Sequence, residues 1–349
     1  MLFLHIGRHK SGTSSIQHFF NQNRTALERD GILYPAPASG VAHHAWSATI
    51  KDVQKGLRDM SALGALRAMV DDYAASANTV VVSSEDFQDI LKPELVREAL
   101  GRHDVTVVAY LREHFAYAWS AYSQRVQANR FTLSFAEFLE DFSQDYLEFL
   151  NRWASAFGAS SIKARIFDRS HLKSGDVVED FCALVGIDNP GRYPRRRTAN
   201  PSIGWRLINA KIEINRSLAG TGKPLASEGA LYNLFEALTA SHPRLAEKPV
   251  FDAEFVAAYQ RRFLESDAAM ARKYFGIDGS PFRLNWSGDS RWDSDDCSIP
   301  EFDETLGRPP FQALAREMSD VLPADVAGRI GWPAKKSTGA AKDQTFQTR

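Results

Sequence analysis

The sequence contains very little cysteine and carries almost no net charge. Only two of its 349 residues are cysteines, Cys182 and Cys297, and their separation fits no metal-ligand spacing. Such low usage is typical of a reducing compartment without a disulfide framework. The 42 lysines and arginines nearly balance the 43 aspartates and glutamates, which argues against a nucleic-acid coat or a polybasic membrane surface. Any anion binding must therefore come from the local placement of charge.

Long apolar segments are also missing. No run approaches the ~20 residues of a membrane span, and the apolar stretch within residues 1–10 is too short for the core of a signal peptide. We therefore expect a soluble, cytoplasmic protein without a transmembrane segment. With 44% hydrophobic residues, the chain can still bury a sizeable core, as one large domain or two of ordinary size.

Short apolar runs alternate with helical patterns through the first two hundred residues. Four runs predict strands: Leu2–Ile6, Thr79–Ser83, Val105–Leu111 and Ser161–Phe167. Periodic apolar positions predict helices over Thr13–Arg29, Asp52–Ala75, Pro93–Gly101 and Glu113–Asn129, with a loop over Tyr34–Ser47. This alternation is typical of a three-layer α/β fold, with a central parallel sheet flanked by helices on both faces.

The pattern becomes mostly helical after Asn200. Helices are expected over Ser202–Leu218, Ala226–Ala240 and Asp252–Tyr274. We predict one domain over residues 1–285, with the core sheet in 1–200 and a helical elaboration in 200–285. Residues 286–334 then form an irregular extension with one short helix, Phe311–Met318, and the polar residues 335–349 form a disordered tail.

The segment Gly7–Ser15 lies between the first predicted strand and the first predicted helix. Such a turn directs free backbone N–H groups and the positive end of the helix dipole at one spot, which binds phosphate or sulfate. Gly12 allows close approach, Lys10 adds a point charge, and Thr13, Ser14 and Ser15 add hydroxyl donors. A hydroxyl-capped helix with a solvated lysine is the simpler alternative. The combination of lysine, glycine and three hydroxyls in one turn favours anion binding.

The order of residues differs from that of a nucleoside triphosphate loop. There the lysine follows the second glycine, and the next hydroxyl holds magnesium. Here Lys10 precedes Gly12, Thr13 takes the place of the lysine, and the apolar run Val80–Ser84 continues into Glu85 without a magnesium-binding aspartate. The loop is therefore expected to bind a donor that requires no metal.

The string HIGRHKSGTSSIQ, residues 5–17, closely resembles the 5′-phosphosulfate loop of the sulfotransferase superfamily that uses 3′-phosphoadenosine 5′-phosphosulfate (PAPS), especially its bacterial carbohydrate-type members. Ser11 stands where threonine is commoner. The resemblance implies a P-loop-like fold, metal-free sulfuryl transfer to an acceptor hydroxyl, and adenosine 3′,5′-bisphosphate as product. Lys10 would contact the bridging oxygen. The donor-binding residues would be Arg8, His9, Lys10, Ser11, Gly12, Thr13, Ser14 and Ser15.

The resemblance also predicts an arginine at a strand end and a serine eight positions later, which together bind the 3′-phosphate. Arg112 and Ser120 match this signature. The planar guanidinium suits a phosphate dianion. Glu113 stands where the family often has proline. The basic cluster Arg195–Arg197 would add Arg196 as a nucleotide contact, with an ordinary solvated loop as the alternative.

Two candidates exist for the base that accepts the acceptor proton. Glu85 follows a predicted strand at the carboxyl edge of the sheet, where open α/β sheets bind their ligands. The pair His43-His44 lies in the loop after the first helix. Related sulfotransferases use either residue type, so the resemblance does not choose. The sheet position favours Glu85 over His44 and His43, while His5 and His9 are assigned supporting roles.

The acceptor is the least constrained part of the prediction. The resemblance favours a hydroxyl on a carbohydrate or glycolipid over a phenol or steroid. Aromatic residues of the helical region could line a pocket, but such positions more often pack in a core: Trp205, Tyr232, Phe235, Tyr259 and Phe263. A kinase with an atypical phosphate loop, or a sulfotransferase-like binding protein without catalysis, are the alternatives. The sequence does not indicate an oligomeric state.

Overall fold

The computed structural model describes residues 1–128, 131–195, 203–219, 228–283, 293 and 295–333. Arg196 and the tail predicted from Lys335 lie outside the described residues. The chain forms two compact units. The first comprises Met1–Ala121, Leu139–Ala199 and Asp252–Gly288, and the second comprises Tyr122–Phe138, Asn200–Phe251 and Asp289–Arg349.

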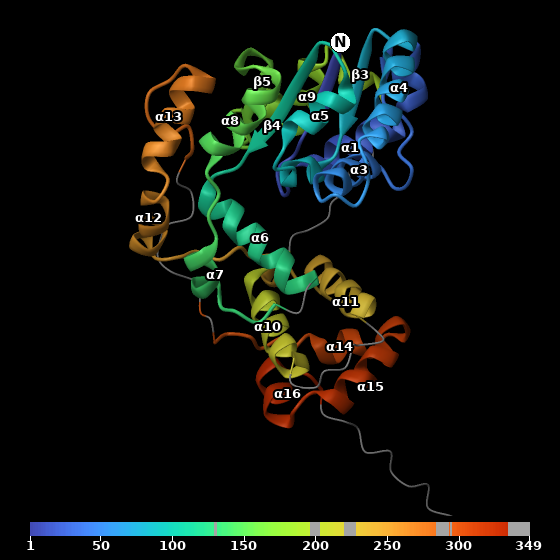
Figure 1. Ribbon diagram of the computed structural model, residues 1–349. Coiled ribbons are helices and arrows are strands. Elements are labelled where there is room, and N and C mark those ends of the chain that lie inside the picture. The colour runs from blue at the N-terminus through green and yellow to red at the C-terminus, as the bar shows by residue number, and fades with distance from the viewer. Residues whose placement is uncertain (129–130, 196–202, 220–227, 284–292, 294, 334–349) are drawn as a thin grey trace, which may run out of the picture. The chain divides into compact units, whose positions relative to one another are not determined.

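The first unit is built on a five-stranded parallel sheet in the order β2-β3-β1-β4-β5 (Figure 1). Its strands are β1 (Leu2–His5), β2 (Ile32–Leu33), β3 (Thr79–Ser83), β4 (Val105–Leu111) and β5 (Ile162–Ile166). β1 occupies the centre and pairs with β3 and β4, so all three strands end at the same edge of the sheet. This arrangement confirms the predicted α/β fold. The two-residue strand β2 was too short for the sequence pattern to indicate.

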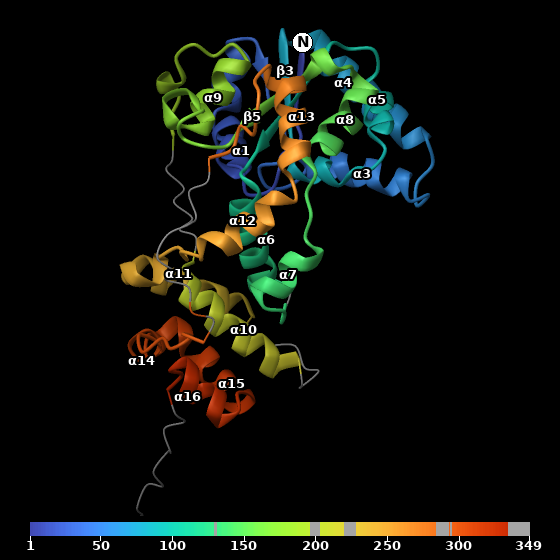
Figure 2. The ribbon, with the colours of Figure 1, turned by 90° about the vertical axis from the view of Figure 1, so that its left-hand side faces the viewer.

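Helices cover both faces of this sheet (Figure 2). One face packs against α1 (Thr13–Gln22), α2 (Arg24–Arg29) and α9 (Val177–Leu184). The other packs against α3 (His44–Gln54), α4 (Ser61–Ser76), α5 (Pro93–Leu100), α8 (Tyr146–Phe157) and α13 (Leu264–Phe275). Alternate residues of β1 serve the two cores: Leu2 and Leu4 face the second set of helices and Phe3 faces the first. The strands are therefore buried on both sides, as parallel sheets require.

Several predicted helices are divided in the structure. The predicted helix Thr13–Arg29 breaks at Asn23, whose side-chain amide donates 2.9 Å and 3.0 Å hydrogen bonds to the carbonyls of Phe19 and Pro194. The region predicted as a loop followed by helix Asp52–Ala75 instead forms α3, which begins at His44, and α4. The predicted helix Asp252–Tyr274 forms α12 (Ala253–Arg261) and α13.

Two further helices belong to the central part of the chain. α6 (His114–Ala128) follows β4, and α7 (Phe135–Asp141) precedes α8. The start of α6 is capped by Glu113, whose carboxylate oxygens each accept a 2.7 Å hydrogen bond from the N–H groups of Phe115 and Ala116. Glu113 thus satisfies two of the free N–H groups at the start of α6.

The helices of the second unit are α10 (Trp205–Ala219), α11 (Glu228–Ser241), α14 (Phe302–Leu306), α15 (Gln312–Val321) and α16 (Ala324–Ile330). Three of them fall in the stretch for which only one short helix, Phe311–Met318, was predicted. Their apolar residues are buried, including Phe302, Leu314 and Ile330. Each of these three helices is too short for the periodicity of its apolar residues to predict it from the sequence. Trp205 and Phe235 are also core residues, whereas Tyr232 is exposed.

No helix among the described residues combines the length and the apolar character that crossing a membrane would require.

Candidate active site at the end of the first strand

The loop after β1 is held by short polar contacts. The Gly7 carbonyl accepts a 2.9 Å hydrogen bond from the Tyr110 N–H on β4. The hydroxyls of Ser11 and Thr13 both donate to the Arg8 carbonyl, at 2.6 Å and 2.9 Å. These two hydroxyl protons, which the sequence assigned to the donor, therefore stabilise the turn itself.

Two residues of the loop adopt left-handed backbone conformations. Lys10 has φ 59° and Gly12, which immediately precedes α1, has φ 79°. A Cβ at Gly12 would lie only 2.8 Å from the side chains of Phe167 and Val177. Glycine is therefore required at position 12 for both conformation and space.

A row of five backbone donors is left open by this conformation. Within the described part of the chain, the N–H groups of Lys10, Ser11, Gly12, Thr13 and Ser14 donate no hydrogen bond. The first internal bond of α1 begins at Ser15, whose N–H donates to the Gly12 carbonyl at 3.0 Å. Consecutive free N–H groups before a helix form an anion-binding site, strengthened by the helix dipole.

Arg112 brings a second cation to this loop. It follows β4, and its guanidinium donates a 3.1 Å hydrogen bond to the Lys10 carbonyl, 102 residues away in sequence. Desolvation and the Arg112 charge lower the pKa of Lys10, whereas the Glu85 carboxylate opposes this shift. Burial likewise lowers the pKa of the Arg112 guanidinium. The charges of Arg112 and Glu85 thus both act on Lys10.

The main chain at Arg112 is fixed from the opposite side. The hydroxyl of Tyr146, at the start of α8, donates a 2.6 Å hydrogen bond to the Arg112 carbonyl. Burial raises the pKa of the Tyr146 phenol, so this hydroxyl keeps the proton that it donates. Ser120 lies farther along α6 and is half-buried, with no hydrogen-bond partner among the described residues.

Arg8 differs from its neighbours in the loop because its side chain is buried. The guanidinium carbon lies between 4.8 Å and 5.3 Å from the ring centres of Phe149, Tyr117 and Tyr146. Only 5% of Arg8 is exposed. Direct contact of this side chain with a ligand, as the sequence predicted, would require it to leave these rings.

Glu85 is positioned by a residue that the sequence reasoning missed. It lies directly beyond β3, against Gly7 of the loop, and its Oε2 accepts a 2.7 Å hydrogen bond from the Gln17 amide. Gln17 is buried on α1 and also lies 3.3 Å from the Ser83 hydroxyl. The signal available in the sequence was a polar residue among the apolar positions Ile16, Phe19 and Phe20, which form the inward face of the helix.

The histidines near this site have separate environments. His43 is buried, with its Nδ1 accepting from the Ser83 N–H at 3.1 Å and its Nε2 donating to the Pro35 carbonyl at 3.0 Å. Burial lowers the pKa of His43 to about 4. Both ring nitrogens are therefore committed to the main chain. His44 is more exposed, and its Nδ1 lies 2.9 Å from the Ser84 hydroxyl and 3.3 Å from the Asp86 carboxylate.

His5 has an even lower pKa, about 3, because it is fully buried. Its Nδ1 is 2.8 Å from the Ser83 hydroxyl, which connects it to Gln17. These contacts are compatible with the supporting role that the sequence predicts for His5.

A cluster of polar residues lies on and around the segment Glu85–Asp89, which follows β3. It consists of His9, His44, Lys51, Asp86 and Asp89. Lys51 Nζ lies 3.2 Å from the Asp89 carboxylate and 4.0 Å from that of Asp86. The ligand atoms of His9, Asp86 and Asp89 lie within 4.8 Å of one another, a grouping that could hold a metal ion. Lys51 already neutralises part of the acidic charge.

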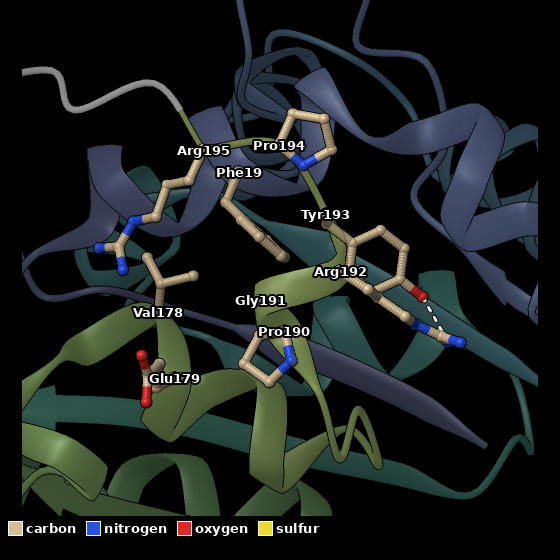
Figure 3. Close-up of a pocket in the computed structure, with 9 residues that line it drawn as sticks. All are labelled: Phe19, Val178, Glu179, Pro190, Gly191, Arg192, Tyr193, Pro194 and Arg195. Atoms are coloured by element: carbon tan, nitrogen blue, oxygen red, sulfur yellow. Dashed lines mark hydrogen bonds between the residues drawn. The ribbon is translucent and has the colours of Figure 1, made fainter.

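A cavity of about 440 Å³ opens beside α1 and α9 (Figure 3). It is lined by Phe19, Val178, Glu179, Pro190, Gly191, Arg192, Tyr193, Pro194 and Arg195. Its guanidinium groups have local partners, because Arg195 lies 2.8 Å from the Asp176 carboxylate and Arg192 lies 2.9 Å from that of Asp30. None of Lys10, Glu85 and Arg112 lines this cavity. The cavity is thus separate from the predicted catalytic residues.

Comparison with known proteins gives limited matches. No model of a known protein family matches the chain. A curated protein of Archaeoglobus fulgidus, described as uncharacterized, is 27% identical over 222 residues, covering 56% of this chain and 54% of that protein. The chain therefore spans about half the length of this relative. The crystal structure of a sulfotransferase from Alicyclobacillus acidocaldarius matches with a TM-score of 0.35 and 18% identity, covering 65% of this chain and 97% of that chain.

Proposed function

We propose that this protein is a sulfotransferase that transfers the sulfuryl group of PAPS to a hydroxyl of a carbohydrate or glycolipid. The observation that carries this proposal is the hydrogen bond from Arg112 to the Lys10 carbonyl. This hydrogen bond joins an arginine at the end of a strand to a loop with five open N–H groups. PAPS carries anionic groups at both its 5′ and 3′ positions, so its binding requires two such neighbouring cationic features. The sequence resemblance independently assigns both features to PAPS binding.

The two anionic ends of the donor would have different partners. The N–H groups of residues 10–14 and the Lys10 ammonium bind the 5′-phosphosulfate. The Arg112 guanidinium and the Ser120 hydroxyl bind the 3′-phosphate, and Arg112 supplies the planar fork that a dianion favours. Because loop and arginine are already in contact, little reorganisation is needed when the donor binds.

The transfer is an in-line displacement. The acceptor oxygen forms a bond to sulfur while the bond from sulfur to the 5′-phosphate oxygen breaks, leaving adenosine 3′,5′-bisphosphate. Lys10 and the open N–H groups stabilise the negative charge that gathers on the leaving oxygen. The proton of the acceptor hydroxyl passes to a carboxylate or imidazole at the end of β3.

Glu85 is the favoured base. One of its oxygens accepts from Gln17, and the other has no hydrogen-bond donor among the described residues, so it can accept a proton. Glu85 also interacts electrostatically with Lys10, which supports assigning both residues to one site. His44 is the alternative base, held by Ser84 and Asp86. His43 would have to break a main-chain hydrogen bond before it could act.

The residues beside Glu85 favour a hydroxyl-rich acceptor. His9, His44, Lys51, Asp86 and Asp89 offer several hydrogen-bonding groups, which suit the hydroxyls of a carbohydrate better than a steroid or phenol ring. The carboxylates also disfavour a polyanionic acceptor, since like charges repel. An uncharged carbohydrate or glycolipid headgroup is therefore the proposed acceptor class.

The direct test is product formation. The purified protein is incubated with PAPS and separate pools of neutral oligosaccharides, glycolipids, sulfated glycans and phenols, and sulfated products are identified by mass spectrometry. We expect sulfation in a neutral carbohydrate or glycolipid pool, reduced roughly 10²–10³-fold by Lys10→Ala. Lys163→Ala, at an exposed lysine on β5, is the control and should not reduce turnover. Sulfation of phenols alone would overturn the acceptor class. Turnover unaffected by Lys10→Ala would overturn the proposed role of the loop.

A further inference from the structure

Arg8 carries a buried positive charge with no acidic partner. In the described part of the chain, no carboxylate lies within ion-pair distance of its guanidinium, and its Nε has no hydrogen-bond acceptor. Its surroundings are the rings of Phe149, Tyr117 and Tyr146. A buried guanidinium without a counter-ion is costly, and an apolar side chain would fill the same space at lower cost. Packing alone therefore does not account for an arginine at this position.

The contacts of Arg8 lead to both parts of the proposed donor site. Its backbone carbonyl accepts the hydroxyls of Ser11 and Thr13, which shapes the loop. Its guanidinium lies 5.3 Å from the ring centre of Tyr146, the residue whose hydroxyl holds the Arg112 carbonyl. One residue thus connects the loop to the strand-end arginine.

The same guanidinium also reaches the helix that carries Ser120. Its Nη2 lies 3.5 Å from the Tyr117 hydroxyl, and its guanidinium carbon lies 5.0 Å from the Tyr117 ring centre. Tyr117 precedes Ser120 by three residues on α6, a spacing that places both on one face of the helix. Arg8 is therefore linked to each of the two residues proposed to bind the 3′-phosphate, through one tyrosine in each case.

We propose that Arg8 is a positioning residue that fixes the Arg112–Ser120 anchor relative to the loop and thereby determines the preference for a 3′-phosphorylated nucleotide. The planar guanidinium is suited to this because it can lie against several rings at once and keep its charge. Arg8 touches no ligand in this role and acts through Tyr146 and Tyr117. The inference rests on the proposed function, which supplies the 3′-phosphate.

The test is the ratio of two dissociation constants, measured by isothermal titration calorimetry. Adenosine 3′,5′-bisphosphate reports both anchors, and adenosine 5′-monophosphate reports the loop alone. The wild-type protein should bind the bisphosphate at least about tenfold more tightly. In Arg8→Met, this preference should fall to roughly threefold or less while monophosphate binding changes little, because misalignment of one charged contact costs about a factor of ten. Arg8→Lys should lie between them.

Two further variants separate positioning from general loss of structure. Tyr146→Phe removes only the hydroxyl that holds the Arg112 carbonyl, and it should lower the ratio even if Arg8→Met fails to fold. Arg97→Met is the matched control. Arg97 also lies over an aromatic ring, Phe157 at 5.6 Å, but it donates to the carbonyl of His103, at the opposite edge of the sheet. The ratio of the two dissociation constants in Arg97→Met should equal that of the wild-type protein.

The possible failures are distinguishable. A wild-type protein without preference for the bisphosphate would overturn the proposed function and this inference with it. A wild-type preference that persists in both Arg8→Met and Tyr146→Phe would overturn only the role of Arg8. If Arg97→Met loses the preference for the bisphosphate to the same extent, the ratio of dissociation constants reports general destabilisation. That result would also overturn the proposed role of Arg8.

Discussion

The Gln17 amide donates a 2.7 Å hydrogen bond to Oε2 of Glu85, across 68 residues of sequence. Gln17 belongs to the helix that follows the loop, and Glu85 belongs to the segment that follows β3. The contact orients a carboxylate that interacts electrostatically with Lys10 and leaves its other oxygen without a hydrogen-bond donor among the described residues. A side chain of the helix that begins at the proposed donor site thereby fixes the proposed base.

Replacement of Glu85 by glutamine should lower kcat by about 10²–10⁴-fold, because the isosteric amide cannot accept the acceptor proton. KM for PAPS should change little. His44→Gln should reduce kcat by less than about fivefold, since the Nδ1 of His44 is engaged by the Ser84 hydroxyl and the Asp86 carboxylate. Steady-state kinetics with both substrates distinguishes the two residues. A large loss of kcat in His44→Gln with a small loss in Glu85→Gln would instead identify His44 as the base.

Gln17→Leu should lower kcat by about tenfold and leave the affinity for adenosine 3′,5′-bisphosphate unchanged, because it releases Glu85 without altering the loop donors. Gln22→Leu is the control on the same helix, since its amide donates only to the Pro194 carbonyl. Kinetics and calorimetry on the same preparations measure both quantities. A parallel loss of nucleotide affinity would mean that Gln17 shapes the loop itself.

Gly12→Ala should reduce the free energy of unfolding by about 2–4 kcal/mol, the sum of left-handed strain and crowding against Phe167 and Val177. Gly40→Ala is the matched control. Gly40 also has a positive φ, 63°, but a Cβ there would have no neighbour within 4 Å. It should cost only about 1 kcal/mol. Denaturant unfolding measures the difference, and equal costs for the two variants would contradict the crowded geometry at Gly12.

The buried His43 should make the protein less stable in acid. Its folded-state pKa is lowered to about 4 from 6.5, so between these values the unfolded chain binds a proton that the folded chain does not. Stability should therefore fall as pH decreases through this window, by about 1.4 kcal/mol per pH unit for this residue. His43→Gln should reduce that slope, whereas His18→Gln, at an exposed position on α1, should not. Denaturant unfolding between pH 4 and 7 compares the slopes, and an unchanged slope in His43→Gln would contradict the assignment.

The parts of the fold that could be predicted depend on local sequence. Short apolar runs identified the central strands, and the sheet order then brought the ends of β1, β3 and β4 to one edge. That topology places Lys10, Glu85 and Arg112 near one another without any knowledge of side-chain contacts. Glu85 and Arg112 lie within two residues of a strand end, and Lys10 lies in the loop after β1.

The parts that could not be predicted depend on distant partners. Asn23 ends α1 because its amide reaches the Pro194 carbonyl, 171 residues away. The burial of Arg8 requires rings from α6 and α8, and the role of Gln17 requires Glu85. Periodicity within one segment contains no information on such contacts.

The most direct test of the proposed donor site is calorimetric titration of the wild-type protein with adenosine 3′,5′-bisphosphate and, separately, with ATP and magnesium. The site is expected to bind the bisphosphate in the presence of EDTA, because Lys10, Arg112 and the open N–H groups supply its positive charge. Addition of magnesium should not strengthen this binding, even though His9, Asp86 and Asp89 could hold an ion nearby. Tight binding of ATP with magnesium, together with no measurable affinity for the bisphosphate, would contradict the sulfotransferase proposal and favour a kinase.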